Sequence, residues 1–330
     1  MNKVQSFFSE IQGRISLMEK TVLFIGGFNQ DIQTVPSFRA VQGDSVPGHI
    51  SITTGGVARN IAENCSRLGL NSSLFSLYGD DSSGAVILKE TAKSGVNTEH
   101  CLCIEGEQSC RYSAFIDEKG EMLYGVNEMS LMNKMTPALM ESKKEILEHS
   151  DVLVLDANLP EETLGYLNRL YSGKTLFIDP VSAAKIGKLK GNMGSSCVIK
   201  PNVIEAEKYA GLRILVEDDY YRAMNAFLSD GISQVYLSAG SQGIYYSDGQ
   251  NKGKMGAVPL RINSVTGAGD AASAALVLSV ILKLNMIESA FLANLAAGSS
   301  LLCSQSINSE LSLSYLLNLC KEYQYESKLS

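Results

Sequence analysis

The sequence lacks the cysteine patterns of a metal site or a disulfide framework, because its seven cysteines include no Cys-x-x-Cys pair and no cysteine–histidine spacing. An odd number of such cysteines predicts free thiols in a reducing compartment, and hence a cytoplasmic protein. A clustered basic patch is also missing. The net charge is −7, and Lys185, Lys188 and Lys190 form only a short run, which we interpret as a solvated helix face. We therefore expect no nucleic-acid polymer as a partner.

Long apolar runs are missing as well. Residues 1–20 contain Phe7 and Phe8 but also Glu10 and Glu19, so this predicted N-terminal extension lacks the apolar core of a signal peptide. The longest mainly apolar stretch, residues 274–282, is too short to cross a bilayer, and we expect no membrane partner. Apolar residues nevertheless make up 45% of the sequence, which is enough to bury a substantial core.

Short apolar runs alternate with segments of helical periodicity along the chain. Strand-like runs occur at 22–26, 74–77, 152–155, 176–178, 197–199 and 235–237, and helical spacing occurs at 57–68 and 218–228. This alternation predicts an α/β fold in which helices cover both faces of a mainly parallel sheet. No linker divides residues 21–330, so we expect a single domain there.

Two intervals, residues 32–54 and 101–127, interrupt this rhythm. The second contains strand-like runs at 111–116 and 122–126, joined by Asp117-Glu118-Lys119-Gly120-Glu121, which is typical of a β-hairpin. We predict that the two intervals form a small β-sheet lid that projects from the domain. Because uncovered strand edges invite pairing, the lid could also hold two copies of the chain together, and we expect a homodimer through it.

The segment Ser264-Val265-Thr266-Gly267-Ala268-Gly269-Asp270-Ala271 precedes a small and apolar run at 272–282. It puts small residues and a carboxylate at the N-terminus of a buried helix, where backbone N–H groups and the helix dipole attract an anion. A carboxylate suits this place if it accepts a proton from a substrate hydroxyl while the N–H groups stabilise a transferring phosphoryl group. The segment therefore predicts a kinase that acts on a small molecule.

Two further segments contain glycines beside candidate ligand residues. The paired Gly55 and Gly56 permit close backbone approach, and Asn60 lies one turn into the following helix; an ordinary turn with an outward Asn60 is the alternative. Gly26-Gly27 does not fit Gly-x-Gly-x-x-Gly, which disfavours a dinucleotide-dependent oxidoreductase. Asp31 either reaches sugar hydroxyls at the sheet crevice or stabilises a turn.

Together these motifs resemble the ribokinase-like (PfkB) family of carbohydrate and nucleoside kinases, from Val22 to about Leu302. Both family signatures are present: Gly55-Gly56 with Asn60, Ala62, Gly69 and Gly79, and Gly267-Ala268-Gly269-Asp270 followed by Ala274-Ala275. The resemblance implies a three-layer ribokinase-like α/β fold with a β-sheet lid, ATP as phosphoryl donor and Mg²⁺ as cofactor. Ser264 stands where the wider family is commonly acidic, so the resemblance leaves a monovalent cation uncertain.

The resemblance also implies a role for each matching residue. For catalysis it implies Asp270 as the base, with an anion hole formed by Gly267, Ala268 and Gly269. The implied substrate-binding residues are Asn29, Asp31, Gly55, Gly56, Asn60 and Asn158. The implied ATP-binding residues are Lys200, Asn202, Ser238, Gly240, Gly243 and Asn294, and Glu205 is the implied magnesium residue. Without the resemblance, Glu205 is a surface carboxylate of a helix, residues 238–243 form a strand-to-strand turn, and Asn294 caps or bridges its neighbours.

Segments outside the two signatures, such as Asp156-Ala157-Asn158-Leu159-Pro160, resemble the pseudouridine kinase branch of the family. This implies transfer of phosphate from ATP to the 5′-hydroxyl of a nucleoside substrate, pseudouridine, with Asp270 accepting a proton late and needing no raised pKa. The alternatives are another nucleoside or sugar kinase, of the ribokinase, fructokinase or adenosine kinase type, or a noncatalytic ligand sensor. Recognition of the base is left open among Gln108, Ser109, Arg111, Tyr112, Ser113 and Asn127.

Overall fold

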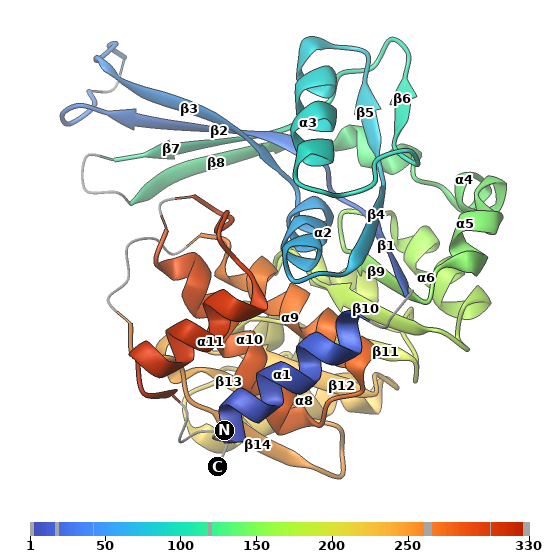
Figure 1. The fold of residues 1–330 in the computed structure, drawn as a ribbon. Helices are drawn as coiled ribbons and strands as arrows, with labels where there is room; N and C mark the ends of the chain where they lie inside the picture. The colour runs from blue at the N-terminus through green and yellow to red at the C-terminus, as the bar shows by residue number, and fades with distance from the viewer. Residues whose placement is uncertain are drawn as a thin grey trace.

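The computed structural model describes residues 3–16, 20–41, 43–117, 121–260, 266–303 and 305–325. Its largest sheet has the strand order β14-β13-β12-β11-β10-β9-β1-β4 (Figure 1). The strands from β4 to β12 in this order are parallel, and β13 and β14 extend the sheet antiparallel at one edge. The strands are β1 (Thr21–Ile25), β4 (Asn71–Phe75), β9 (Val152–Asp156), β10 (Thr175–Asp179), β11 (Cys197–Ile199), β12 (Gln234–Ser238), β13 (Ile244–Ser247) and β14 (Lys252–Met255).

Helices cover both faces of this sheet, which confirms the predicted α/β class. Side chains of each central strand alternate between two hydrophobic layers: in β1, Phe24 belongs to one layer and Leu23 and Ile25 belong to the other. One layer includes α1 (Lys3–Ser16), α2 (Val57–Arg67), α9 (Ala268–Leu282), α10 (Met286–Leu301) and α11 (Leu313–Glu322). The other includes α4 (Pro137–Ser142), α5 (Lys144–His149), α6 (Glu161–Leu170), α7 (Val203–Ala210) and α8 (Glu217–Ser229). Burial on both faces is why these strands are continuous apolar runs in the sequence.

The predicted N-terminal extension contains α1, and this helix packs on the core. The apolar side chains of Val4, Phe8 and Ile11 are at most 3% exposed. Phe7 meets Phe291 of α10 edge to face, with ring centroids 6.1 Å apart. Within the described residues, no helix combines the length and the apolar character that a membrane span requires.

A second, four-stranded sheet projects from this body as a lid (Figure 1). Its order is β3-β2-β7-β8, made of β2 (Asn29–Pro36), β3 (Gly48–Gly55), β7 (Cys110–Ile116) and β8 (Met122–Glu128). β7 and β8 pair antiparallel as the predicted hairpin, and β2 joins them by pairing parallel with β7. The two intervals that lack helical periodicity therefore do come together as one lid sheet.

Three details differ from the sequence-based prediction. The run 74–77 is not one strand, because the chain leaves the main sheet after Phe75 and continues as β5 (Leu77–Gly79), which pairs with β6 (Leu102–Ile104) beside α3 (Ser82–Lys93). The start of the second interval thus belongs to this two-stranded sheet and not to the lid. Short 3₁₀ helices, unpredicted, are η1 (Ser130–Lys134), η2 (Ile186–Leu189) and η3 (Gly240–Gln242).

The solvated helix face predicted for the lysines near η2 is wrong for Lys185 and Lys188, whereas Lys190 is exposed. Lys185 donates to Oδ1 of Asn158, and Lys188 donates to the carbonyl oxygens of Ala157 and Leu159, at 3.0 Å each. These two ammonium groups therefore fasten η2 to the loop that follows β9.

Candidate active site

The candidate polar residues gather along one edge of the main sheet, where five neighbouring parallel strands end. The residues at or just after these ends are Ser238 (β12), Lys200 (β11), Asp179 (β10), Asp156 and Asn158 (β9), and Gly26 and Gly27 (β1). Ligands of open α/β sheets bind outside the carboxyl ends of the strands. The strand order thus places the predicted nucleotide residues toward β11 and β12, and the predicted acceptor residues toward β9 and β1.

Asp156 joins three loops at the acceptor end of this edge. Its buried carboxylate accepts hydrogen bonds from the backbone N–H groups of Gly27 (2.7 Å), Ala58 (2.9 Å) and Asn158 (2.8 Å). These bonds hold the loop after β1 and the first turn of α2 against the end of β9. A buried carboxylate with several such donors is satisfied, so it fixes the floor of the site.

Gly55 and Gly56 are predicted to let a ligand approach the backbone closely. In the structure, both make room for other parts of the protein itself. A Cβ at Gly55 would overlap the Asp31 carboxylate, and a Cβ at Gly56 would overlap the carbonyl of Gly27. Gly56 also has φ +104°, a backbone conformation that L side chains rarely adopt. Gly55 therefore lets β3 lie against the Asp31 side chain of β2, and Gly56 lets the chain before α2 lie directly on the loop after β1.

The predicted anion hole lies at the N-terminus of α9. Gly267 is the residue before the helix, with φ +79°, and a Cβ there would overlap the carbonyl oxygen of Ser306. Ala268, Gly269 and Asp270 form the first turn, whose N–H groups have no intrahelical partners and meet the positive end of the helix dipole. Ser264 and Val265, at the start of the same motif, lie outside the described residues.

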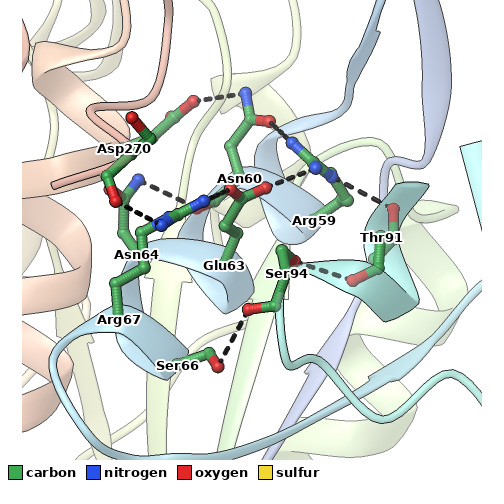
Figure 2. A network of polar contacts seen from close by, with 10 residues as sticks. Arg59, Asn60, Glu63, Asn64, Ser66, Arg67, Thr91, Ser94 and Asp270 are labelled. Atoms are coloured by element: carbon green, nitrogen blue, oxygen red, sulfur yellow. Dashed lines mark hydrogen bonds and ion pairs between the residues drawn. The ribbon is translucent and has the colours of Figure 1, made fainter. Parts of the chain in front are cut away.

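Asp270 is half-buried and is held by a residue of the other signature. Its Oδ2 accepts a hydrogen bond of 2.8 Å from Nδ2 of Asn60, so the alternative of an outward-facing Asn60 is wrong (Figure 2). Burial raises the pKa of the Asp270 carboxyl to about 7, helped by the negative charge of Asp179 and opposed by Asn60 and Lys200. We expected that this residue needed no raised pKa. The structure instead gives this carboxyl a pKa near neutral pH, which is the range that suits a general base.

Lys200 lies between three carboxylates at the middle of the edge. Its Nζ is 3.7 Å from Oδ2 of Asp179, and its positive charge also opposes the raised pKa of Asp270 and of Glu205. Asp179 is fixed by hydrogen bonds from the Val181 backbone N–H and the Ser273 hydroxyl, both at 2.9 Å. A lysine ammonium is a common phosphate ligand, and here it also offsets part of the negative charge of the carboxylates around it.

Glu205 is 4% exposed, so its alternative as a surface carboxylate is wrong. Burial raises the pKa of its carboxyl to about 6. With Asn202 it forms a capping box at the start of α7: Asn202 accepts from the Glu205 backbone N–H, and the Glu205 carboxylate accepts from that of Asn202. The residue pair predicted to serve ATP and magnesium is therefore one rigid unit.

Magnesium fits this region only as part of a nucleotide complex. Among the described residues, no group of three or more histidine, cysteine or acidic side chains could hold an ion by itself. Magnesium, however, usually keeps several waters and is bound through one or two carboxylates together with substrate phosphates. Glu205 and Asp179, beside the anion-attracting start of α9, match that donor set.

The remaining predicted nucleotide residues are placed by a hairpin and by α10. Ser238, Gly240 and Gly243 lie in the connection between β12 and β13, which pair antiparallel, so the alternative of a strand-to-strand turn describes its geometry correctly. Asn294 is buried in α10 and donates to the carbonyl oxygen of Met255 at 3.1 Å, as its bridging alternative proposed. Both observations leave a nucleotide role of these residues a prediction.

At the acceptor end, Asn29 and Asp31 lie in lid strand β2. Asn29 Nδ2 donates to Asp31 Oδ1 at 2.6 Å, and burial raises the pKa of Asp31 while Asn29 and the charge of Arg59 oppose this. Asn158 follows β9 in the main sheet, where its backbone N–H donates to Asp156 and its Oδ1 accepts from Lys185. The predicted acceptor residues thus come from three parts of the fold: Asp31 lies in lid strand β2, Asn60 lies in α2, and Asn158 lies just after β9.

Three residues of this region, Asp156, Asp179 and Arg59, were assigned no role in the site from the sequence. The first two share a signal that was available, because each is an Asp directly after an apolar strand run. Arg59 had no such signal, since its link to Asp270 through Asn60 exists only when α2 packs beside α9. It is 4% exposed and lies next to Asn60 (Figure 2).

Comparisons with known proteins bear on the family and the fold of this chain. The model of the pfkB family of carbohydrate kinases matches residues 19–312. A pseudouridine kinase of Escherichia coli (strain K12) is 33% identical over 300 residues, which cover 90% of this chain and 96% of that protein. Among solved structures, a carbohydrate kinase from Agrobacterium tumefaciens is 26% identical with a TM-score of 0.78, covering 91% of this chain and 97% of that one. Arabidopsis thaliana ribokinase, complexed with ribose and ATP, shares the fold at 18% identity, with a TM-score of 0.79 and coverage of 92% and 98%.

Proposed function

The chain belongs to the pfkB family of carbohydrate kinases, and we propose that it transfers the γ-phosphoryl group of ATP to the 5′-hydroxyl of pseudouridine. The observation that carries the proposed chemistry is the placement of Asp270 in the first turn of α9, held by Asn60 and beside Lys200. The observation that favours this acceptor is the similarity to the pseudouridine kinase of E. coli over nearly the whole of both chains.

In the proposed step, the 5′-oxygen forms a bond to the γ-phosphorus while the bond from that phosphorus to the β,γ-bridging oxygen breaks. The hydroxyl proton passes to the Asp270 carboxylate, and ADP leaves with the bridging oxygen. The first-turn N–H groups of α9 and the Lys200 ammonium stabilise the negative charge on the phosphoryl oxygens. Most of the acceleration comes from orientation and charge, because phosphoryl transfer has a loose transition state.

Magnesium, when bound with ATP, supplies positive charge that screens the phosphate oxygens. Glu205 and Asp179 are the side chains we assign to hold its water shell, because both carboxylates face the region of Lys200. The raised pKa of Glu205, about 6, still leaves this group mainly ionised at neutral pH.

The lid supplies the residues that we propose recognise the base. Strand register puts Asp31, Thr53, Tyr112 and Asn127 in one row across all four strands, on the same face of the lid. The other candidates are engaged elsewhere. Arg111 pairs with Asp81 at 2.7 Å, and Gln108 and Ser109 bind the same small cluster. Ser113 lies on the opposite face.

Tyr112 and Asn127 therefore remain as the base-reading pair. Tyr112 offers a flat ring, and the Asn127 side chain, which is exposed, makes no hydrogen bond to any described residue. Pseudouridine differs from uridine by an additional ring N–H, and a carbonyl such as Oδ1 of Asn127 can accept a hydrogen bond from it. A site that binds this N–H group discriminates against a nucleoside that lacks it, because the carbonyl of the site would then be left without a hydrogen bond.

The opposite face of the lid is apolar, and we assign it to a second copy of this chain. Ile50, Ile52, Phe115, Tyr124 and Val126 lie on it, and each is between 48% and 71% exposed. A self-complementary patch of this kind suits a two-fold dimer. Sedimentation of the wild type against a Tyr124→Ser/Val126→Ser variant tests this: a dimer that dissociates in the variant supports it, and a monomeric wild type refutes it.

A panel of acceptors tests the proposed substrate. Purified protein is given ATP, magnesium and one of pseudouridine, uridine, adenosine, ribose or fructose, and ADP release is measured. We expect the highest kcat/KM with pseudouridine. A higher value with ribose or fructose would assign the protein to the sugar kinases of the same fold, and no ADP release with any acceptor would favour a ligand sensor.

A further inference from the structure

Arg59 is a buried cation whose side chain makes contacts in several directions. Nε donates to the hydroxyl of Thr91 at 3.1 Å, Nη1 donates to Oδ1 of Asn60 at 3.1 Å, and Nη2 forms an ion pair with Glu63 (Figure 2). Neighbouring residues on a helix point in different directions, so a contact between Arg59 and Asn60 requires the long arginine side chain to fold back. The folded conformation is held from α3 by Thr91 and from α2 by Glu63.

This contact decides how the Asn60 amide is oriented. A guanidinium has only donors, so the oxygen of the amide must face Arg59. The NH₂ group then faces the opposite way, where Nδ2 donates to Oδ2 of Asp270 at 2.8 Å. If the amide were turned over, its oxygen would face the Asp270 carboxylate and its NH₂ group would face a cation. Arg59 thus excludes the unproductive orientation.

We propose that Arg59 is a positioning residue for phosphoryl transfer: through Asn60 it fixes the orientation of the Asp270 carboxylate. The inference rests on the proposed role of Asp270 as the base. Charge neutralisation of Glu63 does not by itself require Arg59, because Arg67 also contacts Glu63, at 2.6 Å. Arg67 continues to the carbonyl oxygen of Ser309 at 2.6 Å, so its contacts lead away from Asn60.

The charged groups around these residues determine the direction of the expected effect. Facing Asp270 are Asp179 of β10, Lys200 after β11, Asp156 of β9 and, at longer range, Arg59. Facing Arg59 are Glu63 and Arg67 of α2, Asp31 of β2 and Asp270. Removing Arg59 takes away a positive charge and frees the amide that donates to Asp270. Both changes favour the protonated form of Asp270, so its titration moves to higher pH.

The test compares Arg59→Met and Arg59→Lys with Arg67→Met as the matched control. The first measurement is an NMR titration of Asp270 in protein whose aspartate side chains carry ¹³C. The Asp270 signal is assigned as the one that is absent from the spectrum of Asp270→Asn. We expect the midpoint to move to higher pH in Arg59→Met, to move less in Arg59→Lys, and to stay at the wild-type value in Arg67→Met. This reading needs no substrate, so a wild type that phosphorylates no acceptor would count against the proposed function alone.

The second reading is the kinetics with ATP and the best acceptor. We expect kcat of Arg59→Met to fall by about tenfold to a hundredfold, as for other misplaced catalytic groups, while KM for ATP stays within about twofold of wild type because Arg59 lies on the acceptor side. Circular dichroism verifies that each variant is folded. If Arg59→Met does not fold, Arg59→Lys, which keeps a cation beside Glu63, is used in its place for both measurements. A folded Arg59 variant whose Asp270 midpoint and kcat both equal those of Arg67→Met overturns the proposal.

Discussion

The junction of α2 and α9 and the lid sheet both supply residues to the site, but they differ in how those residues are held. At the junction, Arg59, Asn60 and Asp270 are linked by hydrogen bonds, and Arg59 and Asn60 are buried. In the lid, every residue of β8 is exposed, and the side chain of Asn127 makes no hydrogen bond to a described residue. This difference suits the roles that we propose: the groups that need a fixed geometry lie in the body, and the groups proposed to select an acceptor lie on an exposed sheet.

The largest expected effect is at the junction. Changing Asp270→Asn keeps the shape of the side chain but removes the proton acceptor, so we expect kcat to fall by about a thousandfold or more. ATP affinity, measured by calorimetry without acceptor, stays near the wild-type value because the anion-binding N–H groups are unchanged. Near-normal turnover in this variant would show that Asp270 is not the catalytic base. The proposed difference in role between the junction and the lid would then be wrong as well.

The next effect concerns the start of α9. In Gly267→Ala the added Cβ overlaps the carbonyl of Ser306 at a positive φ, and we expect a loss of about 1–3 kcal/mol of unfolding free energy. We also expect a fall in kcat, because the first turn of α9 must shift. Gly187→Ala is the matched control, because a methyl group added at Gly187 would meet no heavy atom within 4 Å and the backbone there has no positive φ. Thermal and urea unfolding of both variants measure the difference, and equal stability would contradict it.

Substitutions in the lid should affect acceptor binding and leave the chemical step intact. We expect Asn127→Ala to raise KM for pseudouridine by about fivefold to thirtyfold, the equivalent of one hydrogen bond of about 1–2 kcal/mol. KM for ATP and the turnover at saturation should change little, because Asn127 lies in the lid and the predicted nucleotide residues lie at the far strands of the main sheet. Ser113→Ala, on the opposite face of the lid, serves as the control. A change confined to kcat would contradict the assignment of the lid to acceptor selection.

The smallest effect near neutral pH is the dependence of kcat on pH. It should depend on Asp270 at the junction and be unaffected by a substitution in the lid. Because the pKa of Asp270 is raised to about 7, its basic form is lost as pH falls through 7. We expect kcat to fall about tenfold for each unit below that pH. The profile of Asn127→Ala should have the same acid limb as the wild type, measured from about pH 5 to 9. An acid limb near pH 4 would indicate an ordinary carboxylate and would contradict the raised pKa.

Much of the fold could be predicted because its signals are local. The apolar runs of β1, β9, β10, β11 and β12 follow from burial on both faces, and the hairpin of β7 and β8 follows from its turn residues. The break after Phe75 could not be predicted in this way, since a strand that changes sheets keeps the same apolar character. The pairing of β2 with β7 is likewise a contact between distant segments.

The sequence by itself determined the class of fold, the family and the short motifs around Gly55 and Gly267, because each depends on residue type and spacing within one segment. Only the tertiary structure decided that Asn60 faces Asp270, that Glu205 is buried, and that the Asp270 pKa is raised. These properties depend on which segments are neighbours in space. Burial and charge act through space, so a carboxylate acquires its chemistry only when the chain around it has folded.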